Sequence, residues 1–466
     1  MKNADLFRHE GDYLELDNEA AVEHLRQAIR FRTVSHAETS GTNYGEFDAL
    51  HAYLKKSYPR IARAAEWMEI GHSLLLILRG TDESQRPALF MAHQDVVPVV
   101  ASSEKAWRHG PFSGDLDEGY VWGRGAMDIK QMLIGEMEAL EYCLSKGNAP
   151  ERTVILAFGE DEETHSTGVR AMAEELKRRG TELEFVLDEG AGDVMDARDW
   201  GAPGTLICTV GMYEKGYADL RLSVRSPGGH SSNPFRGTSL GKIAEAITDI
   251  LHHPMPASLS ESVRSSLETL RPYMTEEPMK TWASDCGRYE KEILEWFSGR
   301  ESLYHLIRTT AAPTMITPGA PAGNVMPQDM SANINFRLIP ADTPDQMMRH
   351  FRETVSPEVE LSWAQQIGAS RPSRLDSYGF RELKKVLEHY FDRLIFIPAQ
   401  NRGATDARNY EDLCGCVMRF GPFLEEEDIS REGIHGTNER ISVRAYLQGI
   451  RVLIRMMETT CFQAAE

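Results

Sequence analysis

Cysteine is scarce in this sequence, and so are basic residues and long apolar runs. Six cysteines among 466 residues are too few for a scaffold held together by disulfides. The longest purely aliphatic run, Leu74 to Leu78, is far shorter than the ~18 residues that a transmembrane helix needs. The N-terminal residues contain no apolar segment typical of a secretory signal. We therefore expect a cytoplasmic protein with reduced cysteines and no membrane partner.

The shortage of basic residues excludes another class of partner. Lys and Arg number 51 against 71 Asp and Glu, which gives a formal net charge of −20. A general nucleic-acid-binding protein needs a basic face to replace counterions, so we expect no nucleic-acid partner. Small anionic substrates stay possible, because one local arginine can outweigh the overall charge. Apolar residues, at 41%, are abundant enough for a large core.

The first half of the chain alternates between strand and helix patterns. Three short apolar runs, at 88–92, 153–158 and 185–187, are typical of buried parallel strands. Apolar residues recur at helical spacing from Leu133 to Leu144 and again from Val169 to Leu176. This alternation predicts an α/β fold with a doubly wound, mostly parallel sheet.

The pattern changes after residue 212. Residues 217–224 alternate between apolar and polar, as a half-buried antiparallel strand does. Further elements are expected as a helix over 240–251, strands over 312–317 and 330–338, a helix over 344–354 and a strand over 359–363. This order predicts a ferredoxin-like α+β domain over 213–366, with a polar insertion over 254–303. It would interrupt a larger domain formed by 1–212 and 367–466.

Acidic and histidine residues follow the predicted strands. Ligands of open α/β sheets bind at the carboxyl ends of the strands. The candidates are His93 and Asp95 after the first strand, Glu160 to Glu163 after the second, Asp188 and Glu189 after the third, and Asp128 and His435 in glycine-flanked loops. Taken singly, such a residue is usually a helix cap or a solvated side chain. Their convergence favours a site for Zn²⁺, or for Mn²⁺ or Co²⁺, and a shared carboxylate permits two ions.

One motif indicates a different chemistry. Residues 237–241 match the G-x-S-x-G pattern of serine hydrolases, with Ser239 as the nucleophile. That motif needs a buried strand immediately before it, whereas residues 232–236 indicate a loop. A serine hydrolase is therefore the weaker alternative.

The sequence resembles a dizinc metallopeptidase family. That family includes aminoacylases, carboxypeptidase S, glutamate carboxypeptidase, acetylornithine deacetylase and succinyl-diaminopimelate desuccinylase. The matching segments occur in the family's order: MAHQDVVP at 91–98, WRHGPFSG at 107–114, WGRGAMDIK at 122–130, DEE at 161–163, LDEG at 187–190, GGHSS at 228–232, NVMP at 324–327, GATDAR at 403–408 and HGTNER at 435–440. The insertion and the following Arg308-Thr309-Thr310 are most similar to the carboxypeptidase S and N-acyl-amino-acid hydrolase branch.

The resemblance implies two zinc ions and assigns ligands to them. It places His93 and Asp188 on one ion, Glu163 and His435 on the other, and Asp128 between the two. Asp95 would orient His93, and Glu162 would be the general base. All of these positions are filled, so an inactive metal-binding scaffold is the weaker interpretation.

Two of these assignments stay open. The roles of Glu162 and Glu163 depend on how the acidic run is aligned. Glu189 directly follows Asp188, and either carboxylate could bind the metal.

The resemblance also gives the smaller domain a role as a lid and dimerisation domain. His230 would reach the active site of a partner subunit and help to hold the oxyanion. Asn324, Arg337 and Thr405 would bind the substrate, with the planar guanidinium of Arg337 on a free carboxylate. Without the resemblance, His230 would be read as a loop histidine and Arg337 as a sheet-surface arginine.

The function implied by the sequence is hydrolysis by a zinc-dependent amidohydrolase. The substrate would carry an amide bond beside a free carboxylate, as in N-acyl amino acids, dipeptides or short peptides. The enzyme would act as a homodimer.

Overall fold

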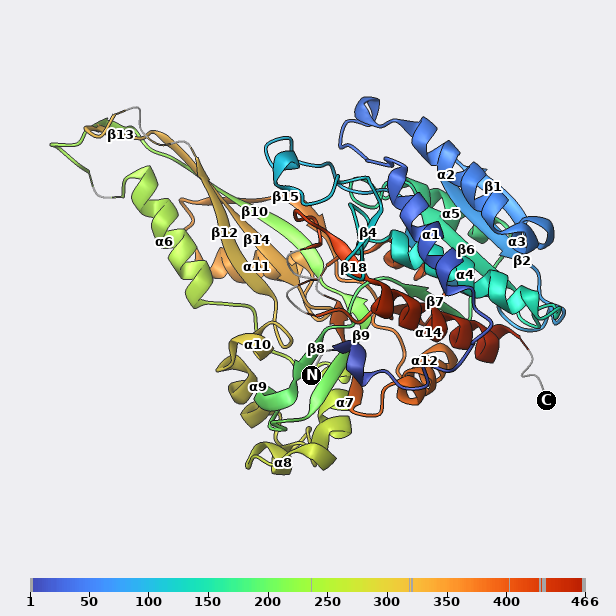
Figure 1. Cartoon of the computed structure of the whole chain (residues 1–466). Helices are drawn as coiled ribbons and strands as arrows, with labels where there is room; N and C mark the ends of the chain where they lie inside the picture. Colours follow the sequence, from blue (N-terminus) through green and yellow to red (C-terminus); the bar gives the residue numbers. More distant parts are fainter. Residues whose placement is uncertain are drawn as a thin grey trace.

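A nine-stranded mixed sheet forms the body of the molecule (Figure 1). The computed structural model describes residues 3–235, 237–317, 319, 322–401, 403–426, 429 and 433–462. The strands follow the order β1-β2-β6-β3-β7-β17-β9-β16, and β8 pairs with β9. Their bounds are β1 Glu66–Ile70, β2 Ser73–Leu78, β3 Ala88–His93, β6 Val154–Gly159, β7 Phe185–Asp188, β8 Val194–Asp196, β9 Leu206–Glu214, β16 Leu394–Asn401 and β17 Val417–Arg419.

The centre of this sheet is parallel, as predicted. β6, β3, β7 and β17 pair in parallel, and so do β9 and β16. β1, β2 and β8 pair antiparallel, as does the contact of β17 with β9. Every residue of β3 and β6 is buried, which explains why these strands are apolar throughout. The predicted α/β class with a mostly parallel sheet is confirmed.

Helices cover the large sheet. They are α1 Asn18–Arg30, α2 Tyr44–Ser57, α3 Pro59–Ala64, α4 Lys130–Ser145, α5 Thr167–Arg178, α12 Tyr378–Tyr390 and α14 Val443–Cys461. α4 is buried almost all round because α1, α3 and α14 pack against it. A small sheet of β4 Asp115–Asp117, β5 Tyr120–Trp122 and β18 Arg440–Ser442 lies beside them.

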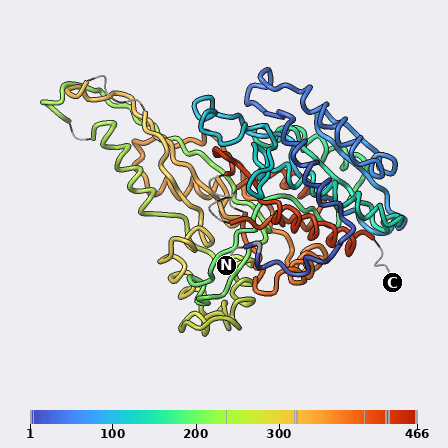
Figure 2. The backbone as a smooth tube through the Cα atoms, in the orientation of Figure 1, coloured from blue at the N-terminus to red at the C-terminus, as the bar shows by residue number. Residues whose placement is uncertain are grey.

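A second, four-stranded antiparallel sheet projects from the body (Figure 2). Its order is β12-β14-β10-β15, with bounds β10 Gly216–Arg225, β12 Thr310–Thr317, β14 Asp329–Leu338 and β15 Glu360–Ile367. The helices α6 Ser239–His252 and α11 Pro344–Thr354 share a buried cluster with it. This order of strands and helices is the predicted ferredoxin-like one. A two-stranded extension, β11 Gly229–His230 with β13 Val325–Met326, forms its far tip (Figure 1). The domain boundaries at 213 and 366 stay a prediction.

The insertion over 254–303 packs on the large sheet. It contains α7 Glu261–Leu270, α8 Met279–Trp282, α9 Glu290–Ser298 and α10 Glu301–Tyr304. Its apolar residues share a buried cluster with Ile207 of β9 and Ile397 of β16. The insertion therefore interrupts the small domain in sequence but covers the edge of the body in space.

All six cysteines are buried and free, in line with the expectation of reduced cysteines. In the described part of the chain, no helix is long and apolar enough to cross a membrane.

Candidate metal centre

The predicted ligands meet where parallel strands of the large sheet end. His93 is the last residue of β3, Glu162 and Glu163 lie in the loop after β6, and Glu189 follows the last residue of β7. These strands are neighbours in the sheet, so their carboxyl ends bring the side chains to one edge.

Asp128 lies between two imidazoles. Its Oδ1 is 3.1 Å from Nε2 of His93, and its Oδ2 is 3.0 Å from Nε2 of His435. Oε1 of Glu163 lies 3.0 Å from the same His435 nitrogen, and Oε1 of Glu189 lies 3.4 Å from His93 Nε2. One carboxylate thus faces two separate histidine and glutamate pairs, which is the arrangement of a bridged two-ion site.

Glu189 belongs to the close group of ligand atoms, and Asp188 does not. Ligand atoms of His93, Glu162 and Glu189 all lie within 4.8 Å of one another. Asp188 instead accepts hydrogen bonds from the backbone N–H of Glu189 at 2.8 Å and of Ala407 at 3.0 Å. These backbone hydrogen bonds occupy the Asp188 carboxylate at the end of β7, whereas Glu189, the next residue, reaches the cluster. The geometry favours Glu189 over Asp188 as the ligand.

Asp95 holds the acidic loop in place. Its buried carboxylate accepts hydrogen bonds from Ser35 Oγ at 2.6 Å and from the backbone N–H groups of Glu162 and Glu163 at 3.1 and 3.2 Å. Nδ1 of His93 lies 3.0 Å from the main-chain oxygen of Asp95 and 3.4 Å from its Oδ1. Asp95 therefore connects the strand end that carries one ligand to the loop that carries another.

Two buried residues that sequence reasoning missed support Asp128. Oε1 of Glu439 accepts hydrogen bonds from the backbone N–H groups of Met127 and Asp128, at 2.8 and 3.1 Å. Its Oε2 pairs with Arg124 at 2.6 Å. Arg124 also donates to the main-chain oxygen of His435 at 3.3 Å. Glu439 stands in the HGTNER segment, but nothing in its spacing separates a buried acceptor from a solvated glutamate.

Burial and mutual repulsion shape the titration of the cluster. Burial opposes ionisation of Asp128, but hydrogen bonds from His435 and His93 outweigh it and hold the pKa of Asp128 below its usual value. The hydrogen bonds of His435 to Asp128 and to Glu163 raise the pKa of His435 to about 10. Burial raises the pKa of Glu189 to about 8 and that of Glu162 well above its usual value. The buried carboxylates of the cluster are therefore more stable when a positive charge lies beside them.

This donor set fits divalent metal ions. Two imidazole nitrogens and three carboxylates suit Zn²⁺, and also Mn²⁺ or Co²⁺. The raised pKa of His435 means that a proton compensates the carboxylates in the absence of a cation. Of the three groups of close metal-ligand side chains among the described residues, two share His93 and lie here.

The cluster opens into a cavity of about 900 Å³. Asp128, Glu162, Glu163, Glu189 and His435 line one part of it. Apolar side chains line another part: Met127, Ile129, Met132, Val194, Met195, Phe423 and Ile434. The cavity has the polar-and-apolar lining typical of small-molecule sites.

His230 and Asn324 lie together, but far from the cluster in their own chain. His230 pairs with Val325 of β13, at the tip of the small domain (Figure 1). The main-chain oxygen of Asn324 accepts a hydrogen bond from Ser231 at 3.0 Å. The imidazole of His230 is exposed, and its Nδ1 accepts a hydrogen bond from the backbone N–H of Ser232 at 3.1 Å.

Arg337 and Thr405 occupy different places. Arg337 lies near the base of the small domain, opposite Tyr217, with its guanidinium carbon 4.9 Å from the centre of the Tyr217 ring. It does not line the cavity. Thr405 lines the cavity, and its hydroxyl donates to Oε1 of the buried Glu214 at 2.8 Å.

Ser239 has no catalytic surroundings. It is buried at the start of α6, and its hydroxyl donates to the main-chain oxygen of Pro327 at 2.7 Å. No histidine hydrogen-bonds to it among the residues that the structure describes. The structure gives no support to the serine-hydrolase alternative.

Known proteins are similar to this chain in sequence and in fold. The sequence model of peptidase family M20/M25/M40 matches residues 89–459. Probable carboxypeptidase S-like 2 of Dictyostelium discoideum is 31% identical over 97% of this chain and 87% of its own. N-fatty-acyl-amino acid synthase/hydrolase PM20D1 of Xenopus tropicalis is 31% identical over 96% of this chain and 87% of its own. The M20 family metallo-carboxypeptidase Sso-CP2 of Sulfolobus solfataricus has a similar fold, with a TM-score of 0.64 at 16% identity over 94% of this chain and 98% of that one.

Proposed function

Since the chain belongs to peptidase family M20/M25/M40 and is a hydrolase of amide or peptide bonds, we propose a more specific function. The protein is a dizinc enzyme that cleaves the amide bond beside a free carboxylate. The substrates are N-acyl amino acids, dipeptides or short peptides. The observation that carries the proposal is the position of Asp128, with one carboxylate oxygen on His93 and the other on His435.

The proposed ligands follow this geometry. His93 and Glu189 hold one zinc ion, Glu163 and His435 hold the other, and Asp128 bridges them. When bound, the two ions supply Lewis acidity to the scissile carbonyl and to the attacking water.

Glu162 is the proposed general base. Its carboxylate lies within 4.8 Å of ligand atoms of His93 and Glu189 and has no hydrogen bond among the described residues. It therefore keeps a free oxygen to take a proton from water and to return it to the leaving nitrogen. The Asp95 carboxylate fixes the backbone of Glu162 and so aims this base at the cavity.

The cavity supports an apolar group on the substrate. Methionine side chains such as Met132 and Met195 adapt to ligands of different shape, and Phe423 and Ile434 extend the apolar lining. The relatives named above act, by their names, on C-terminal residues or on N-fatty-acyl amino acids. An apolar acyl group or side chain in this part of the cavity is consistent with both.

A homodimer with a closing lid completes the proposal. His230 and Asn324 lie at the tip of the small domain, so we assign them to the active site of the partner subunit. Nδ1 of His230 accepts from Ser232, so a neutral ring carries its proton on Nε2 and can donate to the oxyanion. Arg337 binds the substrate carboxylate once the small domain moves over the cavity, and Thr405 contributes to the wall.

Activity measurements with matched substrates test the proposal. The protein is stripped with a chelator, reloaded with Zn²⁺, Mn²⁺ or Co²⁺, and assayed on N-acyl amino acids and dipeptides and on their C-terminal amides. We expect activity to return with metal and to favour the free acids. Arg337→Ala is expected to raise KM for the acids much more than for the amides, because a charge-assisted pair is lost. Full activity after complete metal removal would refute the proposal.

A cytoplasmic location is part of the proposal. It follows only from the composition described above, and cell fractionation tests it.

A further inference from the structure

A third group of potential metal ligands lies away from the cavity. It consists of His9, Asp12 and His389, and one ligand atom from each lies within 4.8 Å of the others. His9 and Asp12 belong to the segment before α1, whereas His389 is in the last turn of α12. The group therefore joins two segments that are 377 positions apart in the sequence.

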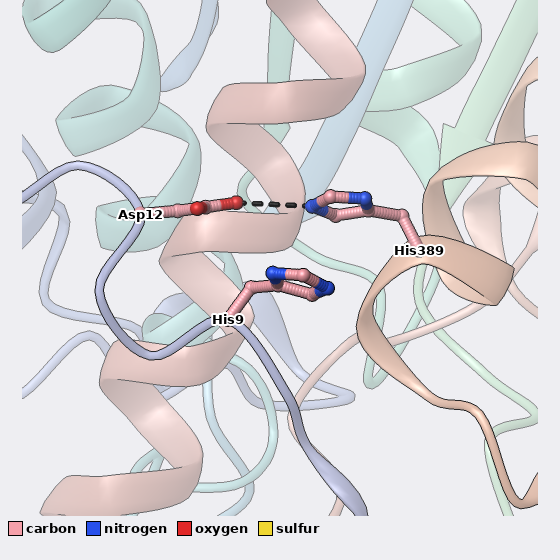
Figure 3. Close-up of side chains that lie close together, drawn as sticks. All are labelled: His9, Asp12 and His389. Atoms are coloured by element: carbon pink, nitrogen blue, oxygen red, sulfur yellow. Dashed lines mark hydrogen bonds and ion pairs between the residues drawn. The ribbon is translucent and has the colours of Figure 1, made fainter.

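The three side chains lie side by side. Nε2 of His389 lies 3.0 Å from Oδ2 of Asp12. The rings of His9 and His389 are stacked, with centres 4.3 Å apart and planes inclined by 14°. Figure 3 shows that each ring turns one nitrogen toward the side on which the Asp12 carboxylate lies.

The backbone holds this group in place. The N–H of Arg8 donates to the main-chain oxygen of Tyr390 at 2.7 Å, and the N–H of Asp12 donates to that of His9 at 2.9 Å. Phe7 stacks on Tyr390, with ring centres 4.7 Å apart. Because these contacts order the chain on both sides, little conformational entropy is left for an ion to remove.

The surroundings favour a cation. The last carbonyls of α12 carry partial negative charge next to His389. Arg8 next to the group pairs with Asp392. Arg451 donates to the main-chain oxygens of Asp12 and Leu447 and, within the described part of the chain, forms no ion pair with the Asp12 carboxylate.

The nitrogen atoms of His9 are available to a metal, which binds neutral imidazole. Among the described residues, the imidazole of His9 has no hydrogen bond or ion pair, so its nitrogens are free to bind.

We propose that His9, Asp12 and His389 form a separate site for one Zn²⁺ or similar divalent transition-metal ion, which fastens the N-terminal segment to the end of α12. Two imidazoles and one carboxylate are ligands that zinc accepts, with water in the fourth position. Tetrahedral zinc needs ligand atoms about 3.3 Å apart, and the exposed His9 can close the remaining distance by rotating its side chain. The other end of the segment reaches the active site, because Asn3 lines the cavity and donates to the main-chain oxygen of Glu425 at 2.7 Å.

Equilibrium dialysis against a buffered micromolar concentration of free zinc tests the site. Wild type, His9→Ala and His389→Gln are compared, with His253→Ala as the control because His253 is an exposed histidine at the end of α6. Each site variant should hold one equivalent of zinc fewer than wild type, and the control should hold the same number. This difference does not depend on how many ions the active site binds. Equal zinc content in wild type and both site variants would overturn the proposal.

Hydrogen exchange gives a readout of the fastening. In wild type, zinc should slow exchange at the amides of Arg8 and Asp12. His9→Ala should abolish that effect and keep the fold, since the substitution removes an exposed ring whose ring contact is with His389. A zinc effect of the same size in His9→Ala would contradict the inference.

Discussion

The carboxylate of Glu439 accepts a hydrogen bond from the backbone N–H of Asp128 at 3.1 Å, although the two residues are 311 positions apart. Glu439 is fully buried and also pairs with Arg124. The proposed bridging ligand is therefore positioned by a residue of the loop that carries His435. Through Arg124, which donates to the main-chain oxygen of His435, the same pair connects two of the proposed ligands.

Replacing Glu439 should weaken metal binding. Glu439→Gln keeps the shape of the side chain but leaves the buried Arg124 without a counter-charge. Loss of a residue that orients metal ligands typically costs about 10–100-fold in metal affinity, and we expect a loss in that range by competition with a chromophoric chelator. Glu138→Gln is the control, because Glu138 is also buried but contacts Tyr58 and His24 instead. Equal metal affinity in both variants would contradict the role given to Glu439.

The neighbours Glu162 and Glu163 should respond differently to the same substitution. Glu162→Gln is expected to keep both metal ions and to lower kcat by about 10²–10⁴-fold, the usual contribution of a general base. Glu163→Gln should lose metal affinity, because Glu163 contacts His435. Metal content and kcat are measured on the same preparations. The opposite pattern would exchange the two roles.

Glu189 and Asp188 offer a second neighbouring pair. Glu189→Gln should lower metal affinity, because its carboxylate lies 3.4 Å from the His93 nitrogen. Asp188→Asn should mainly lower the melting temperature, since Asp188 is buried and accepts backbone hydrogen bonds from Glu189 and Ala407. If Asp188→Asn lost metal affinity and Glu189→Gln kept it, the sequence-based assignment of Asp188 would stand.

The sequence predicted at which edge of the sheet the site lies, but it did not predict which side chains bind there. Continuous apolar runs marked β3, β6 and β7, and the residues after them fell at one edge because parallel strands end together. The sequence does not show which of the two adjacent residues Asp188 and Glu189 turns its side chain toward the site at the end of β7. Both residues are acidic, so composition gave no further help.

Contacts between segments that are far apart in the sequence could not be predicted either. Nothing local in the segment from 254 to 303 indicates that it packs on Ile207 and Ile397 of the large sheet rather than on the small sheet into which it is inserted. The buried pair of Arg124 and Glu439 was hidden for the same reason. Each charge is acceptable in the interior only because the other lies beside it, and one sequence does not show that proximity.

Glu160 should make stability depend on pH. Burial raises the pKa of Glu160 to about 7 from 4.5, with a further contribution from Asp161, and its Oε2 is buried without a hydrogen-bond partner among the described residues. Between these two values the folded protein binds more protons than the unfolded chain, so stability should fall as pH rises from about 4.5 to about 7.

A neutral substitution isolates this effect. Glu160→Gln should raise the free energy of unfolding above about pH 7, by up to roughly 3 kcal/mol for a shift from 4.5 to about 7, and should change it little at low pH. Glu174→Gln, on the exposed face of α5, is the control. Denaturant unfolding at several pH values measures both. A gain of the same size at low pH would show that ionisation of Glu160 is not the cause.

Complementation between two inactive variants tests the proposed use of His230 in the partner's active site. Glu162→Gln lacks the base, and His230→Ala lacks the oxyanion donor. If each active site combines Glu162 of one chain with His230 of the other, a mixed dimer contains one site in which both residues are intact. Mixing the variants should therefore restore activity up to about a quarter of the wild-type level, because half of the dimers are mixed at random exchange and each has one intact site.

The physical basis of this expectation is the placement of His230 on β11. That strand lies with β13 at the end of the small domain that is remote from the body (Figure 1), whereas Glu162 lies at the edge of the large sheet. A swing of the small domain in one chain would have to carry its outermost turn to the cavity, while docking of a second copy needs no such movement. Subunit exchange is followed with differently tagged chains in the same mixture. Exchange without recovery of activity would show that His230 acts within its own chain or only supports the turn with Ser232, and a monomer at assay concentration would rule out the arrangement as well.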